Sequence, residues 1–244
     1  MTEKSLSNSQ TNAEDIAENL ARIREGVERA KAAANRTDTV RIMAVTKTVS
    51  PERVNCAIDM GVDLLGENRV QEYLGKCEQY KPAEVHFIGR LQTNKVKYII
   101  DKVTMIHSVD SIKLAQEIDR RAGEHGVIMD VLAEVNIGGE ETKGGADKQA
   151  VGELCESIAA LPNLRLRGLM AIPPAGCDEK LFSQMQEIFL DIQGKMLHNI
   201  EYRDKSAFDT LSMGMSGDYE AAVRHGATII RIGSGLFGYR EYKK

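Results

Sequence analysis

Two glycine-rich turns near the end of the chain and one lysine near its start have residue types and spacing that could do chemistry. The turns are residues 213–218 (MGMSGD) and 231–235 (RIGSG), and Lys47 follows the apolar run IMAV at 42–45. Each turn follows a segment with the composition of a β-strand, and its free backbone amides could bind a phosphate. A lysine amine forms a Schiff base with a carbonyl compound. Together these features predict a phosphorylated aldehyde, and pyridoxal 5′-phosphate (PLP) is the cofactor of that type.

Four residues of these turns are the candidates for binding the phosphate. Ser216 precedes an expected helix, where serine is a typical N-cap, and Gly217 lets the backbone approach an anion closely. Gly233 and Ser234 offer the same features in the second turn. The alternative interpretation is a plain N-cap at Ser216 and a solvated Lys47. Two such turns after consecutive strands favour phosphate binding over that alternative.

Arg231 is a charged residue inside the apolar run IIRI at 229–232. On a strand it shares a face with Gly233, two residues on, so it should face the interior or the mouth of the fold and needs a partner there. Placed against the pyridine nitrogen of PLP, an arginine would keep that nitrogen unprotonated and weaken the electron sink. A structural ion pair is the alternative.

Further residues at the ends of expected strands have more than one interpretation. Asn68 could cap the following helix or contact a ligand, and His86 is expected to be a hydrogen-bonded core residue that points inward. Met170 and Met213 could pack against a flat ring as readily as in the core. The loop at 138–145 (GGEETKGG) lacks the phosphate-loop pattern, because its lysine precedes the second pair of glycines. We interpret it as a mobile loop.

Strands and helices alternate along the chain. Apolar, β-branched runs begin near Val40, Val62, Glu84, Val103, Ile128, Leu164, Phe208 and Ala227. Amphipathic stretches begin near Pro51, Val70, Asn94, Ser111, Lys148, Glu179 and Ser216, with a short turn after Gly235. This alternation predicts a parallel sheet with crossover helices.

The alternation fits a single (β/α)8 barrel of the TIM type, in which the loops after strands seven and eight commonly hold a phosphate. An open doubly wound sheet is the alternative, but the first strand is followed by KTVSP at 47–51 rather than by Gly-x-Gly-x-x-Gly. Residues 1–12 are polar and are expected to form a disordered tail. An extra N-terminal helix should follow over 13–34, and residues 13–244 should form one domain.

Composition excludes several classes of function. A net charge of −4 over 244 residues gives no reason to expect binding to nucleic acid or to an anionic membrane. No apolar run approaches the ~20 residues that span a bilayer. The four cysteines form no Cys-x-x-Cys pair, and no histidine stands at zinc-ligand spacing. We therefore expect a cytoplasmic protein with reduced thiols and no metal, and the polar outer faces of its helices favour a monomer.

Several segments resemble the YggS/PROSC family of PLP homeostasis proteins. They are AVTKT (44–48), GENRVQE (66–72), HFIGRLQTNK (86–95), VNI (135–137), GLM (168–170), LSMGMSGD (211–218) and RIGS (231–234). The resemblance implies a barrel like the N-terminal domain of bacterial alanine racemase, with PLP held as a Schiff base on Lys47. It also implies that Arg231 faces the pyridine nitrogen and that Asn68 lies near the ring. Departures at Val85, usually aromatic, and Ser234, often threonine, are small.

The resemblance implies a function in intracellular PLP homeostasis, without an established enzymatic activity. Such a protein would hold PLP and supply it to PLP-dependent apo-enzymes, and we expect no second domain to cover the barrel mouth. The alternative is a PLP-dependent amino-acid racemase or decarboxylase with Tyr239, Tyr242 or His86 as acid or base. A third possibility is a barrel for another phosphorylated ligand, with Lys47 acting only as a charge.

Overall fold

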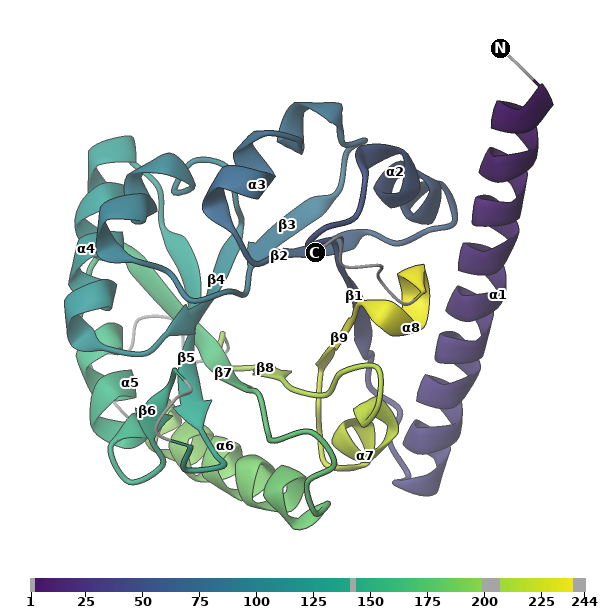
Figure 1. Ribbon diagram of the computed structural model, residues 1–244. Coiled ribbons are helices and arrows are strands. Elements are labelled where there is room, and N and C mark those ends of the chain that lie inside the picture. Colours follow the sequence, from purple (N-terminus) through teal and green to yellow (C-terminus); the bar gives the residue numbers. More distant parts are fainter. Residues whose placement is uncertain (1–2, 141–143, 199–206, 239–244) are drawn as a thin grey trace.

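The computed structural model describes residues 3–140, 144–198 and 207–238. In these residues parallel strands form a closed ring with helices outside it (Figure 1), in the order β4-β3-β2-β1-β9-β8-β7-β5, and β4 pairs with β5 to close it. The two-residue β6 (Ala146–Asp147) pairs with β5 outside this ring. The predicted (β/α)8 barrel is therefore confirmed, because an open sheet would leave β4 and β5 unpaired.

The strands begin within two residues of the predicted positions. They are β1 Arg41–Val45, β2 Leu64–Glu67, β3 Glu84–Phe87, β4 Met105–Val109, β5 Met129–Asn136, β7 Leu164–Ala171, β8 Thr210–Ser212 and β9 Ile229–Ile232. The α-helices are α1 Glu3–Ala33, α2 Pro51–Asp59, α3 Val70–Leu74, α4 Ile112–His125, α5 Val151–Ala159, α6 Lys180–His198, α7 Tyr219–Arg224 and α8 Ser234–Phe237. Two 3₁₀ turns are η1 Cys77–Gln79 and η2 Thr93–Tyr98.

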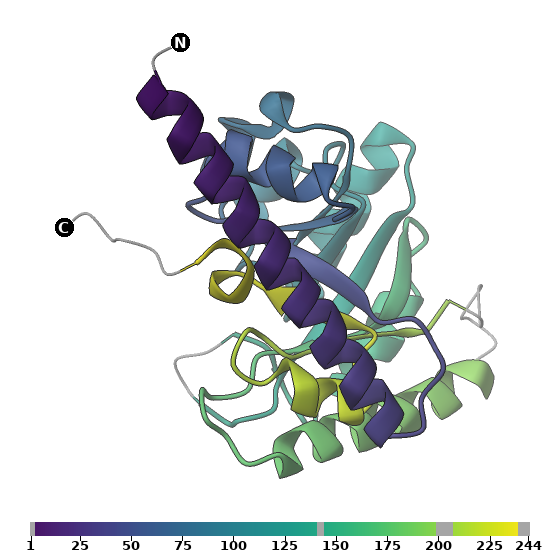
Figure 2. The same cartoon turned by 90° about the vertical axis from the view of Figure 1, so that its right-hand side faces the viewer.

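Helix α1 begins at Glu3 rather than at Ala13, so residues 3–12 of the expected tail extend the helix; Met1 and Thr2 lie outside the described residues. Once a helix is nucleated, each further residue adds a hydrogen bond at little cost, and polar residues can continue it. Its apolar stripe is buried as predicted: Ile16, Leu20, Ile23 and Val27. Figures 1 and 2 show α1 alongside α7 and α8, which it contacts.

Side chains inside the barrel alternate along each strand with those that face the helices, as the strand period of two requires. Two apolar clusters fill part of the interior: Met43, Val45, Leu64, Ile88 and Ile229, and Met105, Leu132 and Met170. Between them lie buried polar side chains from β3, β4, β8 and β9, namely His86, His107, Ser212 and Arg231. The barrel interior is therefore a packed core that contains a group of buried polar side chains.

Candidate functional site

A pocket of about 520 Å³ opens at the carboxyl ends of β1, β2, β8 and β9. It is lined by Val45, Lys47, Asn68, Ile88, Ile172, Met215, Ser216, Gly217, Arg231, Gly233 and Ser234. Seven of the eight predicted cofactor-binding residues line it, and Met213 is the exception. Barrel enzymes carry their active sites at this face, and the volume lies within the roughly 300–1,000 Å³ of typical ligand pockets.

Lys47 is half-buried and lies two residues after the end of β1, and its amine makes no hydrogen bond or ion pair with any described residue. The next residue, Thr48, has a φ of 60°, an outlier for a β-branched side chain. Such strain persists only where the surroundings hold it. The Thr48 amide donates to Glu72 Oε1, and Lys76 Nζ donates to the Thr46 carbonyl at 2.8 Å. These contacts fix the turn that presents Lys47 to the pocket.

A buried carboxylate supports the same turn from behind. Glu67, at the end of β2, accepts hydrogen bonds from Thr46 Oγ1 and from the Tyr80 hydroxyl, both at 2.7 Å. Lys76 Nζ lies 3.4 Å from its Oε1. Burial and the negative charge of Glu67 raise the pKa of Tyr80, so the phenol stays a donor. Sequence reasoning missed this cluster, because its members share no local motif.

The turns after β8 and β9 are joined to each other. The Gly235 amide donates to Ser216 Oγ at 3.0 Å, while the amides of Ser216 and Gly217 have no partner within the described part of the chain. A Cβ added to Gly217 would meet no atom within 4 Å, so the space beside this backbone is open. Free amides beside open space are what an anion requires.

The predicted N-cap at Ser216 is wrong. Helix α7 begins at Tyr219, and Asp218 occupies the N-cap position. Asp218 Oδ1 accepts from the Met215 amide at 2.6 Å, which closes the turn before the helix. The Ser216 hydroxyl serves the neighbouring turn instead. Gly233 is the N-cap of α8, which begins at Ser234, where the first amides of a helix have no intrahelical partner.

Arg231 is 3% exposed and lines the pocket from β9. Its Nη1 donates to Ser212 Oγ and its Nη2 to the Ala171 carbonyl, both at 2.8 Å. Both partners are neutral. The alternative from the sequence, a structural ion pair of Arg231, does not occur among residues 3–140, 144–198 and 207–238. Burial lowers the pKa of Arg231 to about 10, against the opposing effect of Glu134 and Asp218. The guanidinium therefore stays charged at neutral pH.

Asn68 carries an unsatisfied acceptor at the pocket. Its Oδ1 is buried without a hydrogen-bond partner in the described residues. A Cβ on Gly89 would lie 2.1 Å from the Asn68 carbonyl oxygen, so only glycine lets the two backbones approach. Buried acceptors are normally paired, so Asn68 Oδ1 is an exception at a residue that lines the pocket.

Glu134 on β5 is a titratable group that sequence reasoning missed. A Cβ on Gly144 would lie 3.5 Å from Glu134 Oε1 and 3.8 Å from Asp110 Oδ2, so both carboxylates meet the loop after β5. Burial, together with the negative charge of Asp110, raises the pKa of Glu134 to about 7. The charges of Arg231 and Arg90 act in the opposite direction. The barrel mouth thus holds a carboxyl group that titrates near neutrality.

Met213 is buried in the core between the barrel and its helices rather than at the pocket, where Met215 takes its place. Ser212 faces the barrel interior, so its neighbour must face outward. Met170 packs inside the barrel with Met105 and Leu132.

Some predictions fall partly or wholly outside the described residues. They concern residues 141–143 of the loop 138–145, and Tyr239 and Tyr242 near the C-terminus. Among described residues, no group of three or more His, Cys, Asp or Glu could hold a metal ion. Nor does any described helix combine the length and hydropathy needed to cross a membrane.

A larger hollow of about 1110 Å³ adjoins the pocket and shares Asn68 with it. Its cationic lining residues are Arg69, Arg90, Lys95 and Lys113. Lys47 and the joined turns lie outside it, so the smaller pocket is the candidate site.

Known proteins resemble this chain over most of its length. Residues 18–241 match the family "Alanine racemase, N-terminal domain". A protein of Aquifex aeolicus named pyridoxal phosphate homeostasis protein is 44% identical over 92% of this chain and 98% of its own. The protein of that name in Escherichia coli K12 is 35% identical over 94% and 99%. The chain belongs to the pyridoxal phosphate homeostasis protein family.

Solved structures extend the comparison within this family. PipY of Synechococcus elongatus with PLP bound is 31% identical, with a TM-score of 0.76 over 91% of this chain and 100% of its own. A protein of unknown function from Bifidobacterium adolescentis gives 34% identity and a TM-score of 0.86, over 93% and 96%. An alanine racemase of Clostridium difficile is 14% identical with a TM-score of 0.70, and this chain spans 58% of it. That last likeness shows the fold alone.

Proposed function

We propose that this protein binds PLP in the 520 Å³ pocket, holds it as a Schiff base on Lys47, and buffers or supplies it within the cell. The observation that carries the proposal is the meeting of an unpartnered lysine amine, free backbone amides and a buried guanidinium in one pocket. The family's name and the PLP bound to PipY support it.

The residues present fit the parts of this cofactor. The free amides of Ser216 and Gly217 and the start of α8 suit a phosphate, and the orphaned Asn68 Oδ1 suits a hydroxyl donor. When bound, PLP supplies an aldehyde that condenses with an amine and a ring that withdraws electrons. The charged Arg231, placed against a ring nitrogen, opposes its protonation. The chain's own groups thus favour holding the cofactor over using it as a strong electron sink.

A PLP-dependent racemase or decarboxylase is the competing function, and the position of His86 weighs against it. This imidazole is 0% exposed, is bonded to Glu84 and His107, and does not line the pocket. It is therefore not placed to exchange a proton with a substrate. We further propose that the protein is a cytoplasmic monomer that hands PLP to apo-enzymes.

Borohydride reduction tests the attachment. Wild-type protein loaded with PLP and reduced should carry a pyridoxyl adduct, which peptide mass mapping places on Lys47. Lys47→Ala should lose that adduct and keep its melting temperature, because a half-buried lysine at the mouth contributes little packing. Lys113→Ala, in the adjoining hollow, is the matched control and should keep the adduct. A specific adduct elsewhere in Lys47→Ala would refute the assignment.

Incubation with a panel of amino acids, followed by chiral chromatography, separates carrier from enzyme. We expect no conversion by the PLP-loaded protein. Turnover of even ~1 per second, the low end of typical enzymes, would establish the competing function. Transfer to an apo-enzyme, measured as recovered activity, should occur with wild-type protein and not with Lys47→Ala loaded in parallel.

A further inference from the structure

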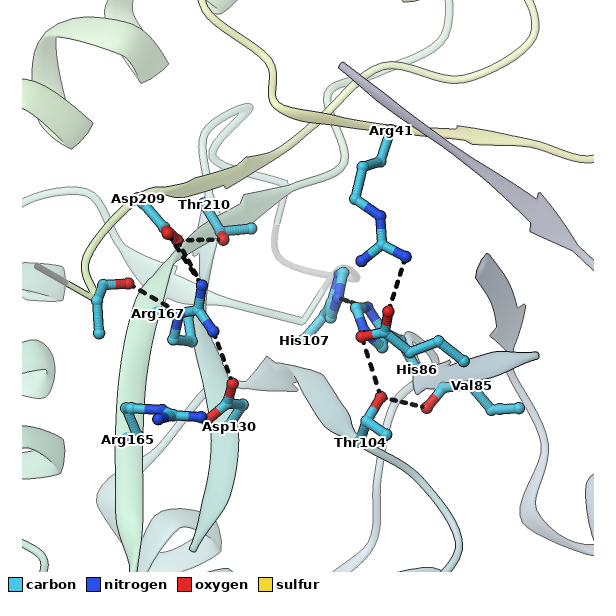
Figure 3. A network of polar contacts seen from close by, with 12 residues as sticks. Arg41, Val85, His86, Thr104, His107, Asp130, Arg165, Arg167, Asp209 and Thr210 are labelled. Carbon is cyan, nitrogen blue, oxygen red and sulfur yellow. Dashed lines mark hydrogen bonds and ion pairs between the residues drawn. The ribbon is translucent and has the colours of Figure 1, made fainter. Parts of the chain in front are cut away.

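A chain of buried hydrogen bonds crosses the barrel interior and ends at Arg231; its two histidines are shown in Figure 3. His86 Nε2 lies 2.7 Å from Glu84 Oε1, and His86 Nδ1 lies 2.8 Å from His107 Nε2. His107 Nδ1 lies 3.1 Å from Ser212 Oγ, which accepts from Arg231 Nη1. His86, His107 and Ser212 are fully buried. Water therefore does not compete for the contacts among these three residues, whereas Glu84 at the end of the chain is 35% exposed.

The far end of the chain is a fixed anion. Glu84 begins β3 at the amino-terminal face of the barrel and accepts from Arg41 Nη2 at 2.7 Å and from Thr104 Oγ1 at 3.3 Å. The hydrogen bond from His86, assisted by Arg41, lowers the pKa of Glu84 to about 2. An ionised carboxylate only accepts hydrogen bonds, so His86 Nε2 must carry the proton between them.

Because Glu84 can only accept, it determines which atom is the donor in every other hydrogen bond of the chain. Burial lowers the pKa of both imidazoles, so each is neutral and carries one N–H. His86 donates from Nε2, and its Nδ1 accepts from the Nε2–H of His107. The Nδ1 of His107 is then an acceptor, and the Ser212 hydroxyl donates to it. Because an arginine only donates, the whole chain runs one way, from Arg231 to Glu84.

The same reasoning fixes the guanidinium. With its proton committed to His107, the Ser212 oxygen presents its lone pairs to Arg231 Nη1, while the Ala171 carbonyl takes Nη2. Two of the five N–H groups of Arg231 therefore donate to protein acceptors, Ser212 Oγ and the Ala171 carbonyl. The remaining groups belong to a residue that lines the pocket.

We propose that His107 is a positioning residue for the pocket: through Ser212 it holds Arg231 in place as a hydrogen-bond donor, and Glu84 and His86 select the tautomer that makes this possible. The part of the inference that concerns PLP rests on the proposed function. The tautomers of the two histidines do not depend on it.

Nitrogen NMR of the ligand-free protein tests the tautomers. Long-range ¹H–¹⁵N spectra at neutral pH should show both buried imidazoles neutral and protonated at Nε2, assigned with single His86 and His107 variants. A proton on Nδ1 of His107, or a charged ring, would overturn the proposal.

Two isosteres of His107 divide the chain at different links. In His107→Asn the side-chain oxygen replaces Nδ1, so Ser212 keeps its acceptor and the contact to His86 is lost. In His107→Gln the amide replaces Nε2, so His86 keeps a donor and Ser212 loses its acceptor. Both variants should lose melting temperature, because each breaks one buried hydrogen bond. Only the second should disturb Arg231.

The readouts are the absorption maximum of bound PLP and its dissociation rate. We expect His107→Asn to match wild type within about twofold, and His107→Gln to release PLP about tenfold faster with a shifted maximum. Ser212→Ala should resemble His107→Gln, and the double variant should add little, since both act through one contact. His125→Gln, at the exposed end of α4, is the control. Equal effects of the Asn and Gln variants would refute the positioning role, whereas failure of wild type to bind PLP would refute only the proposed function.

Discussion

The Gly235 amide donates to the Ser216 hydroxyl at 3.0 Å, which ties the turn after β9 to the turn after β8. One side chain thus sets the spacing of the two groups of free amides at the pocket. A Cβ on Gly235 would lie 3.1 Å from Ser216 Oγ and 3.2 Å from Ile232, so a larger residue there would require these side chains to shift slightly. Each turn depends on the other for its shape.

Replacing Ser216 and Ser234 together with alanine should weaken PLP binding more than it weakens the fold. The change removes two hydroxyls and the bond that joins the turns, so we expect about tenfold weaker retention, or about 1.4 kcal/mol. Equilibrium dialysis and thermal unfolding measure the two effects. Ser157→Ala, exposed on α5, should change neither. Unchanged retention in the double variant would show that the two hydroxyls and the bond between the turns do not contribute to binding.

Thr48→Gly should stabilise the protein, because glycine adopts the φ of 60° without the strain imposed on a β-branched residue. The Thr48 side chain is exposed, so little packing is lost, and we expect about 1 kcal/mol of added stability in urea unfolding. Thr39→Gly is the matched control, an exposed threonine without a positive φ. It should destabilise by about 0.5–1 kcal/mol. If both variants destabilise equally, the backbone at Thr48 is unstrained.

Gly89→Ala should displace Asn68, because its Cβ would lie 2.1 Å from the Asn68 carbonyl oxygen and backbone must move. We expect a loss of about 2–4 kcal/mol in unfolding free energy, as for other steric conflicts in a packed interior. Gly152→Ala lies in α5 with open space around the added Cβ. It should stabilise by about 0.5–1 kcal/mol. Unfolding in urea compares the pair, and an unaltered Gly89→Ala would mean that this contact relaxes freely.

Glu134→Gln should change how stability depends on pH. Because the folded pKa of about 7 exceeds the unfolded value of 4.5, the native state binds more protons between these values and wild type loses stability as pH rises through that window. Glutamine stays neutral, so the variant should gain up to about 3 kcal/mol over wild type from pH 4.5 to pH 8. Urea unfolding of the ligand-free proteins across this range measures the difference. Exposed Glu153→Gln should track wild type throughout, and a Glu134→Gln curve parallel to wild type would contradict the raised pKa.

The barrel could be predicted from the sequence because each strand and helix has a local signal, namely the spacing of its apolar residues and the turn residues that flank it. The pocket followed from the barrel, since parallel strands bring their carboxyl ends together, and seven predicted residues meet there. The predictions were wrong where a shift of one or two positions along the chain changes which way a side chain points or which residue caps a helix. Met213 faces outward and Met215 lines the pocket, and the Asp218 carboxylate took the N-cap position expected for Ser216.

The polar groups behind the site could not be predicted in the same way. His86 and Ser212 both contact His107, yet they come from strands β3 and β8, and only the register of the closed barrel places them at one level. Likewise Glu67 and Tyr80 meet behind Lys47 without a shared motif. Residues that meet only through the tertiary fold have no fixed spacing in the sequence, so a single sequence does not reveal that they are partners.

Helix α1 has a consequence for how the protein is made. It precedes every strand of the barrel, yet it packs against α7 and α8, and Asn19 Nδ2 donates to the Leu236 carbonyl at 3.0 Å. Helix α2 can cover part of α1 early, but the contacts with α7 and α8 can form only once the last strands have been synthesised. The turns braced by α7 and α8 take shape at the same late moment. The proposed PLP site is therefore complete only after β9 and α8 have been synthesised, although Lys47 follows the first strand.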